Sequence, residues 1–352
     1  MKHCVLAAAL FPLTLTWAAS AQPLPPAPPG AQITTRFGIE FGVVGSPNNI
    51  PYRDEDLASR PAHLPGSQFN GQGSIPYTYA LARTETTAAQ WVPFLNAFRP
   101  HWTGDPIFPS LTGGIVSYDS QTGFSTVPGY ENTAVAPSFP FIAAYCNWLH
   151  NNQALTRDAF LSGSYDLRGL DLARPQTWTQ PVAAMPGATY RLPTWSEWNK
   201  GMYYDPNRFG SGQGGWWLFP MRQDTPPISE LPGTPGAQTL AGGSVIPPGP
   251  APFPVGSFPM SQSAFGLLDG SGGVFEALEG TEFVPGFNQL FLYHTGTEDY
   301  GSDILYLSDQ IGWTLAGRPI QFGFGFRVAQ VPTPSTGIVL ASIFFVNKRR
   351  RV

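Results

Sequence analysis

The chain has 352 residues, enough for one large domain or two ordinary ones, and its 42% hydrophobic content excludes a disordered protein. Charged residues make up only 12%, while 39 Gly and 38 Pro indicate a loop-rich fold with few long helices. Of the 19 basic residues, five lie in end segments without carboxylates, which leaves 14 basic against 23 acidic residues. A field of that sign repels phosphate, so we expect no nucleic-acid partner.

Residues 1–21 have the pattern of a secretory signal peptide. Lys2 and His3 precede an apolar run to Trp17, and small residues follow at a cleavage-type site. The apolar run is shorter than the ~20 residues of a membrane span, which disfavours a permanent anchor. Removing this segment also removes Cys4, so the mature chain would carry one thiol, Cys146, and form no intrachain disulfide.

Residues 22–31 are rich in proline and predict a stiff, extended linker, which places the folded domain at residues 32–330. Within that domain, Phe37, Ile39, Phe41 and Val43 alternate with smaller or polar residues and predict a half-buried strand. The stretch 77–83 predicts a second strand by the same argument.

Two helices are predicted next. The first begins after a Thr cap at 86 or 87 and buries an apolar face from Trp91 to Phe98, with Pro93 expected to kink or shorten it. The second begins after Ser138 and buries residues from Phe141 to Leu149. Cys146 lies off that apolar stripe, and we interpret it as a small packing residue and not as a reactive thiol.

A third helix is predicted after Thr194, because Thr194 and Glu197 have the spacing of a capping box. Trp195, Trp198 and Met202 recur at helical intervals behind the cap. We interpret this aromatic face as core and not as a stacking platform for a ligand. A glycine-aromatic strand at 323–329 is expected to close the domain.

The last segment, 331–352, combines a Pro-x-Pro start, an apolar run from Gly337 to Val346, and a basic cluster from Lys348 to Arg351. Ten apolar residues make ~15 Å of helix, half of a ~30 Å hydrocarbon core, so a permanent span would be strained. The basic cluster would stay on the cytoplasmic side.

Six segments, in order along the chain, resemble the formylglycine-generating enzyme or sulfatase-modifying factor family. They are Tyr79–Thr87 with Phe94–Ala97, Ala144–Leu149, Tyr190–Thr194 with Glu197 and Trp198, Pro254–Gly256, Phe265–Asp269 with Gly272 and Glu276, and Gly325–Arg327. The resemblance implies an α+β domain with a decorated C-type-lectin-like fold and little regular secondary structure.

The C-terminal segment resembles a PEP-CTERM sorting signal, with Thr333 where an acidic residue usually stands. That resemblance implies a bacterial protein exported across the inner membrane and transiently anchored there by its tail. It also implies a sorting or processing protease as a partner, and a final location in the cell envelope or extracellular matrix.

The chemistry of the family is not supported by the residues present. Formylglycine-generating enzymes oxidise a substrate cysteine using oxygen and copper, and a soft thiolate pair upstream of the Gly-Phe-Arg closure holds the metal. In this chain Tyr293–Gln321 contains no cysteine and no Arg-Gly-Gly-Ser motif. We therefore expect copper binding and oxidase activity to be lost, and the histidines show no zinc or iron spacing in compensation.

Calcium is the other metal that the resemblance implies. The family's structural Ca²⁺ site surrounds a Gly-Asn-x-Trp-Glu-Trp motif, of which this chain keeps Glu276 but has Gly273, Phe275 and Ala277 at the other positions. Glu276 is thus the one candidate metal ligand. We interpret the acids at 298, 299 and 303 as solvated loop residues, and Arg327 and Glu85 as semi-buried ionic or hydrogen-bonding anchors.

The sequence thus predicts an exported envelope or matrix protein whose formylglycine-generating-enzyme-like domain is a non-catalytic binding or structural module, with an envelope protein, matrix protein or glycan as its partner. Two alternatives stay open. One is an oxidoreductase of the same family that oxidises protein cysteine or another substrate. The other is a dedicated glycan-binding module.

Overall fold

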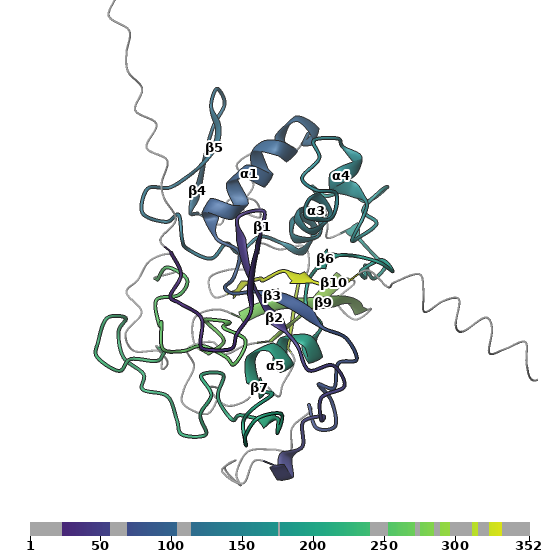
Figure 1. The fold of residues 1–352 in the computed structure, drawn as a ribbon. Coiled ribbons are helices and arrows are strands. Elements are labelled where there is room, and N and C mark those ends of the chain that lie inside the picture. Colours follow the sequence, from purple (N-terminus) through teal and green to yellow (C-terminus); the bar gives the residue numbers. More distant parts are fainter. Residues whose placement is uncertain are drawn as a thin grey trace, which may run out of the picture.

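The computed structural model describes residues 23–56, 69–103, 114–174, 177–239, 253–271, 275–284, 289–295, 312–315 and 324–332. The predicted signal peptide, nearly all of the predicted sorting segment, and the acids at 298, 299 and 303 lie outside these residues. In the described part, short helices and strands alternate with long irregular connections (Figure 1). This content confirms the predicted α+β class with little regular secondary structure.

The largest sheet has five antiparallel strands in the order β1-β2-β3-β13-β6. The strands are β1 (Ile33–Arg36), β2 (Ile39–Val44), β3 (Tyr79–Ala82), β13 (Ala329–Gln330) and β6 (Tyr190–Arg191). The two strands predicted at the start of the domain are therefore present as β2 and β3. Phe37, predicted inside the first strand, instead lies with Gly38 in the tight turn between β1 and β2, because both have positive φ angles of 54° and 73°.

A second sheet has four strands in the order β11-β10-β9-β12. They are β9 (Phe275–Val284), β10 (Gln289–Thr295), β11 (Gly312–Leu315) and β12 (Phe324–Gly325), and β12 pairs with β9 in parallel. Two smaller hairpins are formed by β4 (Val116–Asp119) with β5 (Gly123–Thr126) and by β7 (Tyr204–Asp205) with β8 (Gly215–Trp216). Single 3₁₀ turns cover Asp54–Asp56 and Arg99–His101.

The three predicted helices are present as α1 (Ala88–Phe98), α3 (Phe139–His150) and α5 (Trp195–Tyr203), together with a single turn, α4 (Asp158–Leu161). Thr87 and Thr194 close capping boxes with Gln90 and Glu197, which confirms the predicted helix starts. Pro93 does not shorten α1, which runs on to Phe98. The buried apolar face of α1, packed in the core, outweighs the one backbone bond that proline removes. No helix among the described residues is long and apolar enough to cross a membrane.

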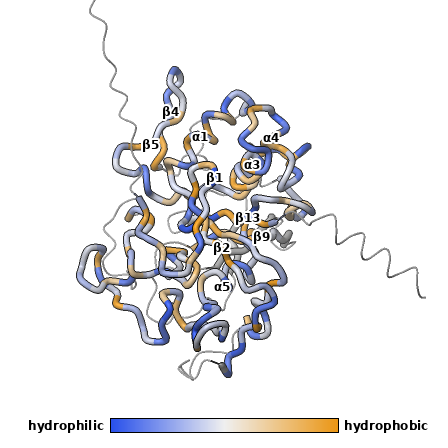
Figure 2. Tube along the Cα trace, in the orientation of Figure 1, coloured by the Kyte–Doolittle hydropathy of each residue, from blue (hydrophilic) through white to orange (hydrophobic). Residues whose placement is uncertain are grey.

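Helices cover both faces of the five-stranded sheet. Figure 1 shows α1, α3 and α4 on one side of the central strands and α5 with β7 on the other. Alternate residues of β3 follow this division: Ala80 and Ala82 join the core around α1 and α3, while Tyr79 and Leu81 join the core around α5. The helix α3 and the central strands are accordingly among the apolar segments, coloured orange in Figure 2.

The proline-rich stretch that the sequence assigns to a linker lies against the domain from residue 23 onward. Arg83 Nη2 donates to the carbonyl oxygen of Pro25 at 2.7 Å, and Gln262 Nε2 donates to that of Pro26 at 2.9 Å. Proline has no N–H but keeps its carbonyl, so such a segment can be held by donors from elsewhere. Ala27 and Pro28 pack close to Gly266 in the loop before β9.

Gly42 in β2 lies very close to the loop before β9. A Cβ built on Gly42 would lie 2.4 Å from the carbonyl oxygen of Phe265 and 2.9 Å from Leu267 Cδ2. Because the nearer atom is backbone, Gly42→Ala should lower the free energy of unfolding by about 1–3 kcal/mol in urea denaturation. Gly45→Ala is the matched control, since no atom of the described residues lies within 4 Å of a Cβ added there. Equal midpoints for the two variants would contradict the close approach.

Candidate functional site

The candidate ligand Glu276 lies in the interior, paired with Arg327. Both side chains are buried, and Arg327 Nε and Nη2 donate to the two carboxylate oxygens of Glu276 at 2.5 Å and 2.6 Å. The two residues meet because β12 pairs with β9, with Gly325 opposite Glu276. A bidentate guanidinium–carboxylate pair of this kind is among the strong charge-assisted hydrogen bonds of proteins.

The remaining donors of Arg327 bind three backbone carbonyls. Nη1 donates to Ala82 at 3.0 Å and to Arg83 at 3.2 Å, and Nη2 donates to Leu268 at 3.1 Å. Trp198 Nε1 on α5 completes the cluster by donating to Glu276 Oε2 at 3.0 Å. Arg327 is therefore an anchor, as the sequence predicts, but a fully buried one.

These contacts bring together segments that carry the family resemblance. The stretch after β3, the loop at 265–269, β9, α5 and the Gly-Phe-Arg turn all touch the Arg327–Glu276 pair directly. Phe326, next to Arg327, contacts the ring of Tyr145 on α3 at 5.8 Å between ring centroids. Segments far apart in the sequence thus share one structural centre.

A second buried pair holds the start of α5. Arg191 Nη1 and Nη2 donate to Glu197 at 2.8 Å and 2.7 Å, and Tyr77 Oη donates to the same carboxylate at 2.8 Å. Burial alone would raise the pKa of Glu197, but these partners lower it overall. Trp198 is fully buried and Trp195 is half-buried against Phe69, which places the aromatic face of α5 in the core as predicted.

Two further carboxyl groups lie near Arg327. Burial and the nearby charges of Asp269 and Glu276 raise the pKa of Glu85 well above its ordinary range, and Glu85 Oε2 has no hydrogen-bond partner in the described part of the chain. Burial raises the pKa of Asp269 to about 6, although this carboxylate accepts a bond from Gly256 N at 2.7 Å. Three carboxyl groups thus lie near one guanidinium, and burial is the main reason that the protonated form of Glu85 is favoured.

This centre does not fit a calcium ion. Both oxygens of Glu276 accept hydrogen bonds from Arg327, so a cation at Glu276 would face a guanidinium charge. Among the described residues, no group of three or more His, Cys, Asp or Glu side chains is arranged to hold a metal. Calcium binding through Glu276 stays a prediction of the resemblance alone.

Cys146 does not fit a soft metal either. It is fully buried in α3, and burial, followed by the charge of Glu279, raises the pKa of its thiol. A copper ion is held by thiolates, and a buried neutral thiol supplies none. Cys146 packs among the aromatic and aliphatic residues around α1 and α3, in agreement with its interpretation as a packing residue.

The described residues also form an open pocket of about 490 Å³ at the surface, which we call the N-terminal pocket. Its walls come from the end of the proline-rich stretch, the end of β2 and the turn after it, the residue just before β3, the turns after β7 and β8, and the loop before β9. The lining residues are Pro29, Gly30, Ala31, Gln32, Val43, Gly45, Ser46, Thr78, Asp205, Pro206, Asn207, Arg222, Ala264 and Phe265. Sequence reasoning missed this pocket, because its lining comes from separate short segments that carry no motif.

Two lining residues have strained backbones. Ser46 and Arg222 have φ angles of 54° and 61°, in the left-handed region that non-glycine residues rarely adopt. Lys200 Nζ donates to the carbonyl oxygen of Ser46 at 2.9 Å, and burial lowers the pKa of this lysine to about 8. Arg222 lies in a tight turn closed by a bond from Phe219 N to Gln223 O at 3.0 Å. Strained residues of this kind often cluster where a ligand binds.

Within the described part of the chain, the side chains of Gln32, Ser46, Thr78 and Arg222 form no hydrogen bond or ion pair. The pocket therefore offers one guanidinium, one amide and two hydroxyls to a ligand. None of these groups is hydrogen-bonded to a neighbouring base among the described residues, and all four can bind a polar ligand.

No model of a known protein family matches the sequence, and no curated protein matches it. Among solved structures, the crystal structure of CarF aligns at 18% identity and a TM-score of 0.49, over 84% of this chain and 100% of CarF. PvdO from Pseudomonas aeruginosa aligns at 17% identity and a TM-score of 0.44, over 86% of this chain and 98% of PvdO.

A third structure, Treponema denticola variable protein 1, aligns at 15% identity and a TM-score of 0.43, over 87% of this chain and 100% of that protein. Similarity at this level says nothing about activity. The α+β class is therefore assigned from the helices and strands of this chain. The role of the domain has to be inferred from the residues of its candidate site.

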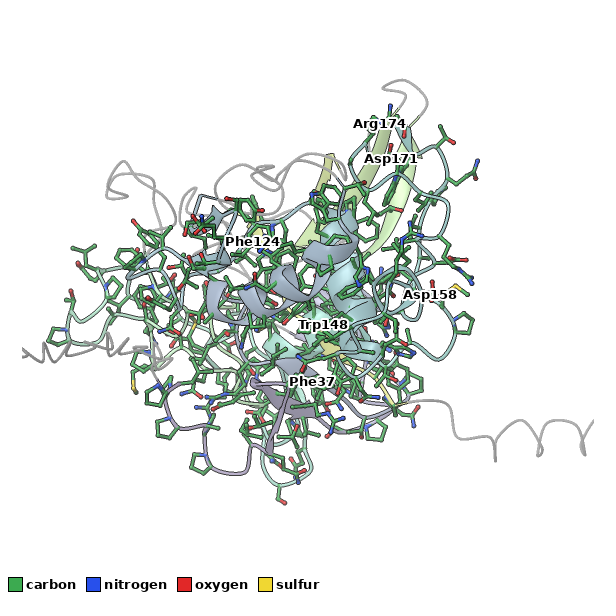
Figure 3. The ribbon with its side chains drawn as sticks, turned by 90° about the horizontal axis from the view of Figure 1, so that it is seen from above. Phe37, Phe124, Trp148, Asp158, Asp171 and Arg174 are labelled. Atoms are coloured by element: carbon green, nitrogen blue, oxygen red, sulfur yellow. The ribbon has the colours of Figure 1, made fainter. Side chains whose placement is uncertain are left out.

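The Arg327–Glu276 pair should dominate stability. Glu276→Gln leaves a buried guanidinium without its counter-charge, so the free energy of unfolding should fall by about 3–5 kcal/mol. Asp171→Asn is the control, because Asp171 and Arg174 form an exposed ion pair at the edge of the molecule (Figure 3). Its loss should lower the free energy of unfolding by less than about 1 kcal/mol. Similar losses in urea denaturation for both variants would contradict the assignment.

Asp269 should make stability depend on pH. Its folded-state pKa of about 6 lies above the ordinary 3.8, so the stabilisation from its proton is complete below about pH 4 and is lost as the pH rises through 6. Asp269→Asn keeps an acceptor for Gly256 and, because Asn tolerates the φ of 57° at this position, should raise the free energy of unfolding at pH 7.5 by up to about 3 kcal/mol.

At pH 4 the same Asp269→Asn substitution should have little effect. Unfolding curves in urea at both pH values measure the difference. An equal effect at the two pH values would show that Asp269 does not titrate between them.

Proposed function

We propose that this chain is an exported bacterial envelope or matrix protein whose formylglycine-generating-enzyme-like domain is a non-catalytic binding or structural module. The observation that carries the proposal is the state of its thiols. Oxidation of the family type needs a copper ion held by two thiolates, and after loss of the leader the chain has Cys146 alone. That thiol is buried in α3 with a raised pKa.

The buried charges support the same conclusion. Two ion pairs lie in the interior, where a substrate does not reach them: Arg327 pairs with Glu276, and Arg191 pairs with Glu197. Glu85 is buried, which raises its pKa, and its side chain is not open to a ligand. These groups stabilise the fold, and a ligand binds instead to residues at the surface.

Export and display at the envelope rest on the end segments of the sequence. The leader at 1–21 supports export, and the tail at 331–352 supports transient anchoring in the inner membrane followed by processing. The partner on the outside is an envelope protein, a matrix protein or a glycan.

Copper titration distinguishes this proposal from an oxidoreductase of the same family. The purified chain should bind no stoichiometric copper(I) and should consume no oxygen with a cysteine-containing peptide and a reductant. Cys146→Ala should behave like the natural chain in both measurements, because the thiol is buried. Oxygen uptake that requires the peptide, with an aldehyde formed at its cysteine, would overturn the proposal.

A further inference from the structure

We infer that the N-terminal pocket binds a uronic acid unit of an acidic saccharide. The inference rests on the proposed function, in which this domain is a binding module, and it names the ligand class. It stands on the residues that line the pocket, on their unused hydrogen-bonding groups, and on the charge balance around Arg222.

The lining alternates polar and apolar groups. Gln32, Ser46 and Thr78 offer an amide and two hydroxyls that bind nothing within the described part of the chain. Pro29 and Pro206 add apolar walls beside them. A sugar ring presents hydroxyls along its rim and C–H groups on its faces, and so matches a lining of this kind. The volume of about 490 Å³ lies within the usual range of small-ligand sites.

The guanidinium of Arg222, in the pocket lining, selects an acidic sugar over a neutral one. Asp205 lines the pocket, but its oxygens accept bonds from Asn207 N at 2.8 Å and Trp217 Nε1 at 3.2 Å. Asp224, two residues beyond Arg222, pairs with Arg208 at 2.6 Å. Among the described residues Arg222 has no carboxylate partner, and a guanidinium binds a carboxylate with two parallel hydrogen bonds.

The backbone at Arg222 adds an independent argument. Its φ of 61° is one that glycine adopts without strain and arginine does not. Arg222 lies in the turn closed by Phe219 and Gln223, and its exposed guanidinium is at the rim of the pocket. The strained backbone lowers the stability of the fold. Strain retained at such a position is explained by what the side chain binds.

The first experiment is isothermal titration calorimetry of the purified full-length chain with two oligosaccharides of equal length. A galacturonic acid tetramer should bind at least about tenfold more tightly than a galactose tetramer, because only the acidic sugar gains a charge-assisted bond. Affinity for the acidic tetramer should fall as salt is added. Free galacturonic acid, titrated alongside, shows whether a single unit is enough or an oligomer is needed.

Variants of Arg222 test the mechanism. Arg222→Gln should weaken binding of the acidic tetramer by about tenfold to a hundredfold and leave that of the galactose tetramer unchanged. Arg222→Gly should weaken binding equally while its unfolding midpoint stays equal or rises, because the strain is removed. Arg157→Gln is the matched control, since Arg157 is an exposed arginine outside the pocket lining.

Equal affinities for the two tetramers, no binding of either, or natural affinity in Arg222→Gln would each overturn the inference. None of these results would be evidence for oxidase activity, which is tested separately by copper binding and oxygen uptake. Oxygen turnover with a cysteine peptide would overturn the non-catalytic proposal and leave the measured preference for acidic sugars standing.

Discussion

The fold depends on one buried guanidinium. Removing an arginine from water is costly unless every donor finds an acceptor, and Arg327 meets this condition with the Glu276 carboxylate and three backbone carbonyls. The acceptors come from β9, from the end of β3 and from the loop before β9. Because any one of them left unpaired would be destabilising, the pair fixes how these segments are placed relative to one another.

The central sheet adds a second constraint. The last described strand, β13, lies between β3 and β6, so the sheet is completed only when the end of the domain returns to its beginning. Its strands are covered on both faces, with the α1 and α3 core on one side and the α5 core on the other. Small residues permit this closeness. A Cβ at Gly201 on α5 would lie 2.6 Å from Leu81 Cδ1, just as one at Gly42 would meet the loop before β9.

These constraints separate stability from binding. The paired acids and arginines of the interior anchor distant segments, and the perturbed pKa values of Glu85 and Asp269 follow first from burial. The N-terminal pocket lies at the surface, with one wall from the proline-rich stretch held by Arg83 and Gln262. Four of its polar side chains, those of Gln32, Ser46, Thr78 and Arg222, are unpaired among the described residues, and two of its backbone positions are strained. The pocket that we propose as the binding site is thus formed by short segments packed on a buried interior.

The sequence alone determined what depends on near neighbours. Capping at Thr194 and Glu197, the buried face of α1 and the burial of Trp198 follow from helical spacing, and the missing thiol pair is a fact of composition. Only the tertiary structure decided the rest. Glu276, a candidate metal ligand in the sequence, meets a guanidinium 51 residues away. The prolines of the expected linker find donors at Arg83 and Gln262, and the pocket joins segments from residue 29 to residue 265. Local patterns report the period and caps of one element, whereas charge pairing and pocket formation depend on which distant segments meet.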